Sequence, residues 1–205
     1  MTNELANSLV TLRSRLRGHD ESDAWFQIWQ MTVGAVYSLA RIAPFLPGHD
    51  LDHAVQSEEV ARRLATGLPM EEGAFPTWSI GYYLNSAEFR IQSAFHRLLR
   101  AFTHRDGSVW VLARAITKRA TELRLPPPVL AIITGFLGDC TSRNQPGGCL
   151  AIIHHRSNAL KHDPVHDTSD RFSFRNRSED AIIAVRDLIL LTDQLGILCD
   201  EVVAA

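Results

Sequence analysis

Apolar residues recur at spacings of three and four along most of the chain, which is the period of an amphipathic α-helix. Leu5, Leu9, Leu12 and Leu16 show this spacing in the first segment. The pattern and its Gly, Pro and Asp-Gly breaks predict helices over 3–17, 24–43, 58–66, 78–104, 109–125, 129–137, 148–161 and 178–202. Only Phe172 and Phe174 alternate in a way that permits a short strand. The sequence therefore predicts an all-α helical bundle.

The longest continuous pattern, over 78–104, carries a polar stripe beside its apolar one. Asn85, Glu88, Gln92 and His96 follow one another at spacings of three or four. A polar stripe on a long helix is usually its solvated face. The alternative is that Asn85, Glu88 or Gln92 faces a neighbouring helix and helps to orient a site there.

The stretch from Cys149 to His166 combines an apolar beginning with a cationic end. It reads CLAIIHHRSNALKHDPVH, and the Asp163-Pro164 pair stops the predicted helix over 148–161 because proline lacks a backbone N–H. At about 100° per residue, the stripe that contains His155 and His162 lies about 100° from Arg156. The end of this helix is therefore the chain's strongest candidate for chemistry.

An arginine and a histidine together suit the cleavage of RNA by its own 2′-hydroxyl. Arg156 could hold phosphate oxygens with its guanidinium fork, and His162 could move a proton near neutral pH. That reaction needs no metal. The same cations would also complement the dipole of a helix C-terminus, where a charge contributes at most about 1–2 kcal/mol to stability. Spacing alone leaves both interpretations open.

Arg156-x5-His162, at the end of an apolar helix, resembles the Arg-(four to six residues)-His signature of HEPN domains. The segment 83–99, YLNSAEFRIQSAFHRLL, also resembles the long helix of that superfamily. The resemblance covers roughly 78–162. It implies a HEPN-like helical bundle over 73–205, with residues 1–72 as an N-terminal helical extension that packs on it.

The resemblance also implies a function, a metal-independent endoribonuclease that cleaves RNA in a toxin–antitoxin or defence setting. Its site would lie between two copies of the chain, so a homodimer is expected, with a cognate antitoxin protein as a further partner and no cofactor. Arg156 would hold the phosphate and His162 would be the acid or base. The supporting residues would be Ser157, Asn158, Lys161, His155, Glu88 and Asn85.

Two other functions compete with this one. Many HEPN ribonucleases carry a polar residue, often Asn, directly after the arginine, whereas this chain has Ser157 there and Asn158 next. That departure favours a non-catalytic HEPN-fold module that binds a nucleotide, RNA or a protein partner. A metal-binding bundle could use His154, His155, His162 and His166, but Pro164 separates the last two, and we predict no metal.

Composition limits how the chain could bind RNA and indicates where in the cell it is located. The formal charge of −2 over 205 residues requires any RNA binding to use a local basic patch, for which Arg114, Lys118, Arg119 and Arg124 are the best candidates. Three cysteines without a CxxC motif fit reduced thiols. The beginning, MTNELANSLV, does not resemble a signal peptide, and charges interrupt the longest apolar run, over 181–199. We therefore expect a cytoplasmic protein without a membrane span.

Overall fold

The computed structural model describes residues 2–16, 23–43, 77–138, 142–162 and 174–204, with the side chains of 2, 77–79, 159–162 and 200–204 excepted. These residues form an all-helical bundle, and none of them is in a strand. The helices are α1 (Thr2–Arg15), α2 (Ala24–Ile42), α4 (Thr77–Thr103), α5 (Val109–Lys118), α6 (Pro127–Leu137), α7 (Gly148–His162) and α8 (Phe174–Ala204). The all-α prediction is confirmed. The helix predicted over 58–66 lies outside the described residues.

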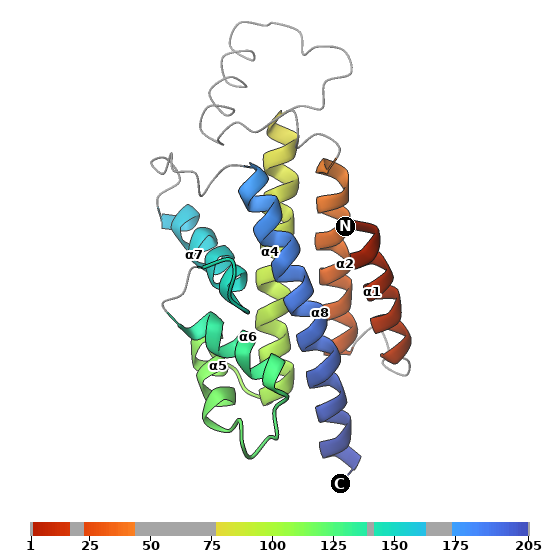
Figure 1. The fold of residues 1–205 in the computed structure, drawn as a ribbon, viewed down its shortest axis with the longest axis vertical. Coiled ribbons are helices and arrows are strands. Elements are labelled where there is room, and N and C mark those ends of the chain that lie inside the picture. Colours follow the sequence, from red (N-terminus) through yellow and green to blue (C-terminus); the bar gives the residue numbers. More distant parts are fainter. Residues whose placement is uncertain (1, 17–22, 44–76, 139–141, 163–173, 205) are drawn as a thin grey trace, which may run out of the picture.

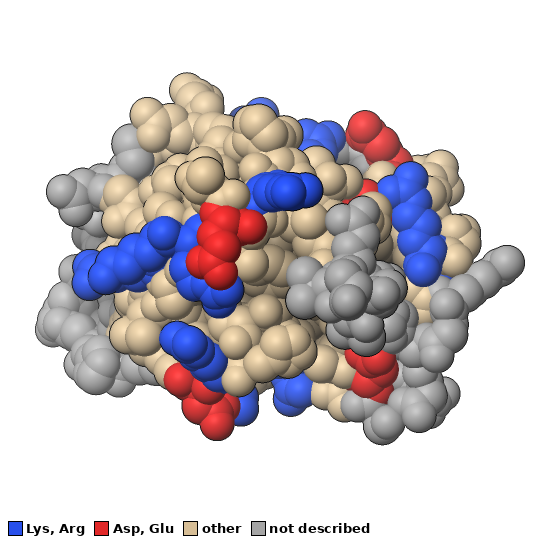
Figure 2. Space-filling model, turned by 90° about the horizontal axis from the view of Figure 1, so that it is seen from below, with Lys and Arg blue, Asp and Glu red and all other residues tan. Residues whose placement is uncertain are grey.

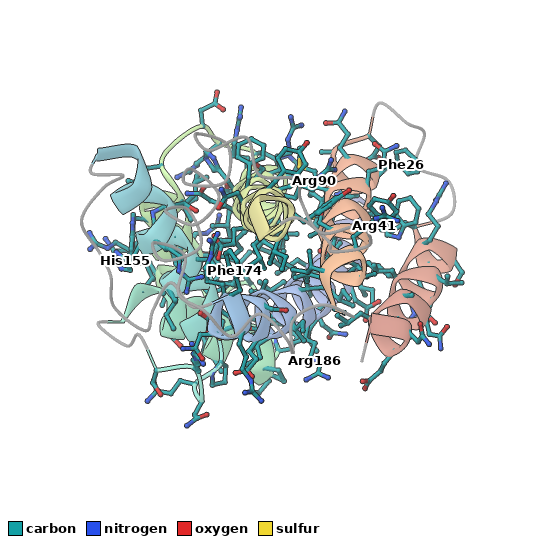
Figure 3. All side chains as sticks on the ribbon, turned by 90° about the horizontal axis from the view of Figure 1, so that it is seen from above. Phe26, Arg41, Arg90, His155, Phe174 and Arg186 are labelled. Carbon is teal, nitrogen blue, oxygen red and sulfur yellow. The ribbon has the colours of Figure 1, made fainter. Side chains whose placement is uncertain are left out.

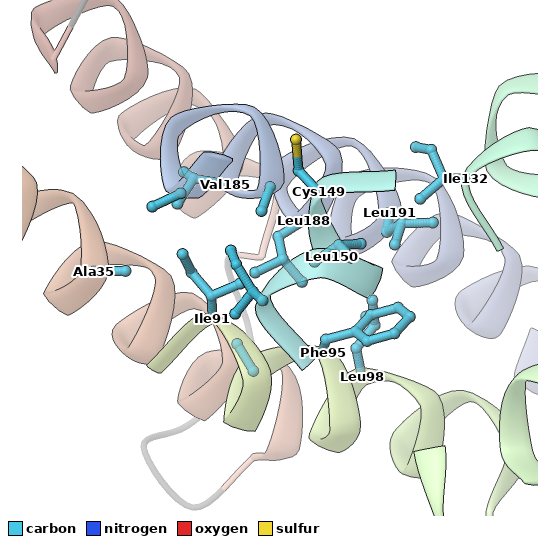
Figure 4. Packing of buried hydrophobic residues seen from close by; sticks show 14 of the residues in the cluster. Ala35, Ile91, Phe95, Leu98, Ile132, Cys149, Leu150, Val185, Leu188 and Leu191 are labelled. Carbon is cyan, nitrogen blue, oxygen red and sulfur yellow. The ribbon is translucent and has the colours of Figure 1, made fainter. Parts of the chain in front are cut away.

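Helix α4 is the centre of the bundle. It packs against α2, α8, α5 and α7, and α2 packs in turn against α1 and α8 (Figure 1). A single hydrophobic cluster collects buried side chains from every described helix. Figure 4 shows part of it, where Ile91 and Leu98 of α4 meet Leu150 of α7 and Leu188 of α8. Helices α1 and α2 share this core, and the predicted boundary at 72/73 falls outside the described residues.

Local sequence explains where several helices begin and end. The Asp23 carboxylate accepts a hydrogen bond from the backbone N–H of Trp25 at 2.7 Å and caps α2. Helix α5 ends at Lys118, so the prediction of one helix to 125 is wrong. Arg124 has a left-handed φ of +50°, and the N–H of Leu125 bonds back to the carbonyl of Ala120. This turn returns Leu125 to the core.

The start of α7 is fixed by two glycines that let backbones meet. Gly147 has a φ of +78°, and a Cβ there would overlap the carbonyl oxygen of Ile132 and lie 2.8 Å from the amide nitrogen of Phe136. A Cβ on Gly135 would overlap the carbonyl oxygen of Pro146. Only glycine allows the turn before α7 to lie directly on α6.

Helix α8 begins four residues earlier than predicted. Phe174 is buried in its first turn and is not part of a strand, so the short strand permitted by the alternation with Phe172 is wrong at this residue. Because the helix starts earlier, Ser178 and Asp180 lie in its second turn and not at its N-terminus. Both side chains consequently face the interior.

None of the described helices is both long enough and apolar enough to cross a membrane.

Candidate functional site

Arg156 lies inside the bundle, between α4 and α8. One terminal nitrogen, Nη1, donates to the Glu88 carboxylate, and Nη2 lies 2.5 Å from Oδ2 of Asp180. Only 3% of the Arg156 side chain is exposed to solvent. The sequence predicts that a charge at this helix end contributes at most about 1–2 kcal/mol to stability. That prediction is wrong for Arg156, because its side chain points toward the neighbouring helices.

A second arginine holds the other side of Glu88. Nη2 of Arg177 lies 2.7 Å from Oε2 of Glu88, and Nε lies 3.1 Å from Oε1. The same Nη2 donates to Oδ1 of Asn85 at 2.6 Å. Glu88, Arg156, Arg177 and Asp180 thus form one buried set of two positive and two negative charges, which we call the ion network.

Arg143 extends the ion network toward solvent. Its Nε lies 2.7 Å from Oδ1 of Asp180, and Nη1 donates to Oδ1 of Asn176 at 3.1 Å. The Cys149 thiol packs against the same aspartate, at 3.9 Å from Oδ1. Burial and the negative charge of Asp180 raise the pKa of Cys149 to about 12, so this cysteine stays a thiol.

Burial and pairing act in opposite directions on these charges. Burial alone would raise the pKa of Glu88, but the charges of Arg177 and Arg156 outweigh it, and the pKa lies below its ordinary value. Burial would likewise lower the pKa of Arg156, but Glu88 and Asp180 raise it above the ordinary value. For Asp180, burial raises the pKa despite Arg156 and Arg143. Arg156 is therefore held in its charged form by two fixed partners.

Of the two α7 histidines whose side chains the structure describes, His154 makes more contacts than His155. Its Nε2 lies 3.2 Å from the indole Nε1 of Trp110, and the side-chain amide of Gln92 lies 3.1 Å from Nδ1. An indole N–H can only donate, so Nε2 of His154 accepts from Trp110. The ring also meets the edge of Phe136. His154 therefore joins α7 to α4, α5 and α6 as part of the packing.

The remaining predicted site residues are dispersed. His155 is exposed at the outer edge of α7 (Figure 3), whereas Ser157 and Asn158 are half-buried, and Asn158 lies 3.1 Å from Nε2 of His154. His162 and Lys161 belong to α7, but their side chains lie outside the described part of the chain. The pairing of Arg156 with His162 stays a prediction.

Of the predicted supporting residues, Glu88 belongs to the ion network and Asn85 contacts it. The sequence did not predict a role for Arg177, Asp180 or Arg143. Glu88 is buried, so the solvated-face interpretation of the polar stripe is wrong at that position. The sequence Ser178-Glu179-Asp180 looks like the beginning of a helix, where Asp180 would be exposed, so it did not predict a buried ion pair at this residue. The spacing of three between Arg177 and Asp180 was the available signal, because such residues share a helix face.

The described residues include no group of three or more His, Cys, Asp or Glu side chains that could hold a metal ion. His162 and His166, two members of the histidine set considered for a metal, lie outside that description.

Comparisons of the chain with models of protein families, with curated proteins and with solved structures find no match. The resemblance to HEPN proteins therefore rests on the Arg156-x5-His162 motif and the segment 83–99 alone.

Proposed function

We propose that this chain is a non-catalytic helical module of HEPN type that binds RNA and does not cleave it. The position of Arg156 carries this proposal. A group that stabilises the charge of a reacting phosphate must lie about 3 Å from the oxygen on which that charge develops. Arg156 makes its contacts at that range with Glu88 and Asp180, inside the protein.

Releasing Arg156 toward a phosphate would be costly. Glu88 and Asp180 would each lose one arginine, and breaking a buried ion pair costs about 3–5 kcal/mol. Substrate binding would have to offset that cost at every turnover. The geometry therefore favours a structural role for Arg156, which holds α7 against α4 and α8.

Binding of RNA is supported by the HEPN resemblance and by local positive charge. The net charge of −2 excludes attraction by the whole chain, but exposed cations on and after α5 offer a local surface. Arg114, Lys118 and Arg124 are exposed, and Arg119 is paired with Glu122 at 2.7 Å. Contacts of this kind follow the phosphate backbone and carry no sequence preference. We also propose a cytoplasmic location.

The test is to incubate the full chain at micromolar concentration with labelled single-stranded and hairpin RNA, with and without EDTA. Intact RNA on a denaturing gel, together with binding by fluorescence anisotropy, is the expected result. Metal-independent cleavage that disappears in His162→Ala would overturn the proposal. It would restore the endoribonuclease hypothesis, with its homodimer and its cognate antitoxin.

A further inference from the structure

The outer edge of α4 carries two aromatic rings followed by a row of arginines. Tyr82 and Arg100 are 18 residues apart, about five helical turns, so they lie at the same angle around the helix and roughly 27 Å apart along it. Phe89 lies about 20° to one side of that line and Arg97 about 60° to the other. With Arg105, just beyond the helix, these four residues form what we call the α4 track.

The rings of the α4 track stand in solvent. Tyr82 is 63% exposed and Phe89 is 66% exposed, whereas most large apolar side chains of α4 are buried. Figure 3 shows Arg90 on this outer edge and Arg186 on the opposite face of the molecule. Exposed aromatic rings contribute little to folding, so these two are available to a ligand.

The far end of the track is a hollow between the first turn of α2 and the last turn of α4. Its volume is about 340 Å³, and its lining is Ala24, Arg97, Arg100, Ala101, His104, Arg105 and Asp106. Arg97 donates to Gln27, and Arg100 pairs with Asp106 at the surface. A surface ion pair contributes only about 0–1 kcal/mol, so a phosphate can compete for Arg100.

The loop behind this hollow is held in place. His96 Nε2 lies 2.8 Å from the carbonyl oxygen of Gly107, and the Ser108 hydroxyl accepts from the backbone N–H of Val111 as the cap of α5. His104 adopts a left-handed φ of +51°, which closes the end of α4. These contacts fix the backbone that presents Arg105, so less conformational entropy is lost when it binds.

Charge is concentrated at this end of the molecule. Residues 97–124 contain seven Lys and Arg and two acidic residues, a formal charge of +5 in a chain whose total is −2. Figure 2 looks at this end and shows Lys and Arg side chains standing out around it, with acidic side chains among them. The remainder of the chain has a formal charge of −7, so residues 97–124 stand out as a region that attracts a polyanion.

We infer that the α4 track binds single-stranded nucleic acid, with bases stacked on Tyr82 and Phe89 and phosphates held by Arg97, Arg100 and Arg105. Aromatic platforms beside a cationic groove are the combination that single strands require. In a duplex the bases are already stacked on one another, so they are not free to stack on the two rings. The inference rests on the proposed function and adds the α4 track to the α5 cations as its binding surface.

The experiment measures the binding of the full chain to a fluorescein-labelled 12-nucleotide single-stranded DNA, the matching RNA and a duplex of the same length. DNA lacks the 2′-hydroxyl, so binding can be measured even if the protein cleaves RNA. Salt is varied from 50 to 200 mM. The variants are Arg97→Gln/Arg100→Gln, Tyr82→Leu/Phe89→Leu and, on the opposite face, Arg186→Gln as the matched control.

Three phosphate contacts predict that log affinity plotted against log salt concentration has a slope of about −2 for a single strand. Arg97→Gln/Arg100→Gln removes two of these contacts and should reduce the magnitude of that slope by about 1.4. The aromatic pair variant should weaken binding at least about ten-fold and leave the slope unchanged. Arg186→Gln should change neither, and the duplex should bind more weakly than the single strand.

Several outcomes would overturn the inference. One is equal binding of the single strand by wild type and both pair variants, in which case RNA binding itself survives and uses another surface. Another is a preference for the duplex. A third is a dimer, seen by light scattering, that dissociates in Tyr82→Leu/Phe89→Leu, since the rings would then belong to a contact between two copies. If the protein cleaves RNA and the α4 track variants still weaken its binding, only the non-catalytic proposal is refuted.

Discussion

Replacing Arg156 separates a structural arginine from a catalytic one. Arg156→Ala leaves the Glu88 carboxylate with Arg177 and the Asp180 carboxylate with Arg143, each short of one partner in the interior. Removing one member of a buried ion pair typically costs about 3–5 kcal/mol, whereas a charge at an exposed helix end is worth at most about 1–2 kcal/mol. For a chain of this size, the larger figure corresponds to a fall in Tm of about 6–20 °C.

The assay is urea unfolding followed by circular dichroism at 222 nm, with Arg114→Ala as the control because that arginine is exposed on α5. The control should change the free energy of unfolding by less than about 0.5 kcal/mol. Arg156→Lys should fall between wild type and Arg156→Ala, since an ammonium group is a point charge and cannot bridge two carboxylates as a guanidinium does.

A double-mutant cycle with Arg156→Met and Glu88→Gln should give a coupling energy of about 0.5–3 kcal/mol, because the two side chains contact each other directly. The result that refutes this reasoning is an Arg156→Ala protein within about 1 kcal/mol of wild type, the range of an exposed helix-end charge. The ion network would then not hold α7, and the catalytic interpretation of Arg156 would regain its basis.

Further predictions concern the turn before α7, its carboxylate partner and assembly. Gly147→Ala should destabilise the protein by more than about 2 kcal/mol in the same assay, because its Cβ would meet backbone atoms that cannot move aside, whereas Gly107→Ala has room and should cost less than about 1 kcal/mol. Burial raises the pKa of Asp187 to about 6, although the hydrogen bond from the Gly147 N–H opposes the shift. The folded protein therefore binds the Asp187 proton more tightly than the unfolded chain does. This proton's contribution to the free energy of unfolding is complete below about pH 4 and is lost as pH rises through 6. Asp187→Asn should match wild type near pH 4 and exceed its free energy of unfolding at pH 8 by up to about 3 kcal/mol; equal pH profiles would contradict the shift. The homodimer expected from the HEPN resemblance predicts twice the chain mass in light scattering at tens of micromolar, and a monomer would count against a site shared by two copies.

The sequence by itself determined the helices. Apolar spacing, the Gly and Asp-Gly breaks, and the prolines after 125 are local signals, so the bundle and most of its boundaries could be predicted. Where a boundary depended on distant contacts, the prediction failed. Helix α5 stops early because Leu125 turns back to the core, and α8 starts early because Phe174 is buried there.

Tertiary structure alone decided what the charged residues do. Helical periodicity gives the direction of Arg156 around its own axis, but it cannot say that Glu88, 68 residues away, and Asp180 lie on that side. The sequence made the same arginine look like a phosphate ligand at a helix end. Because burial makes an unpaired charge expensive, its partners define its role, and those partners come from helices that only folding brings together.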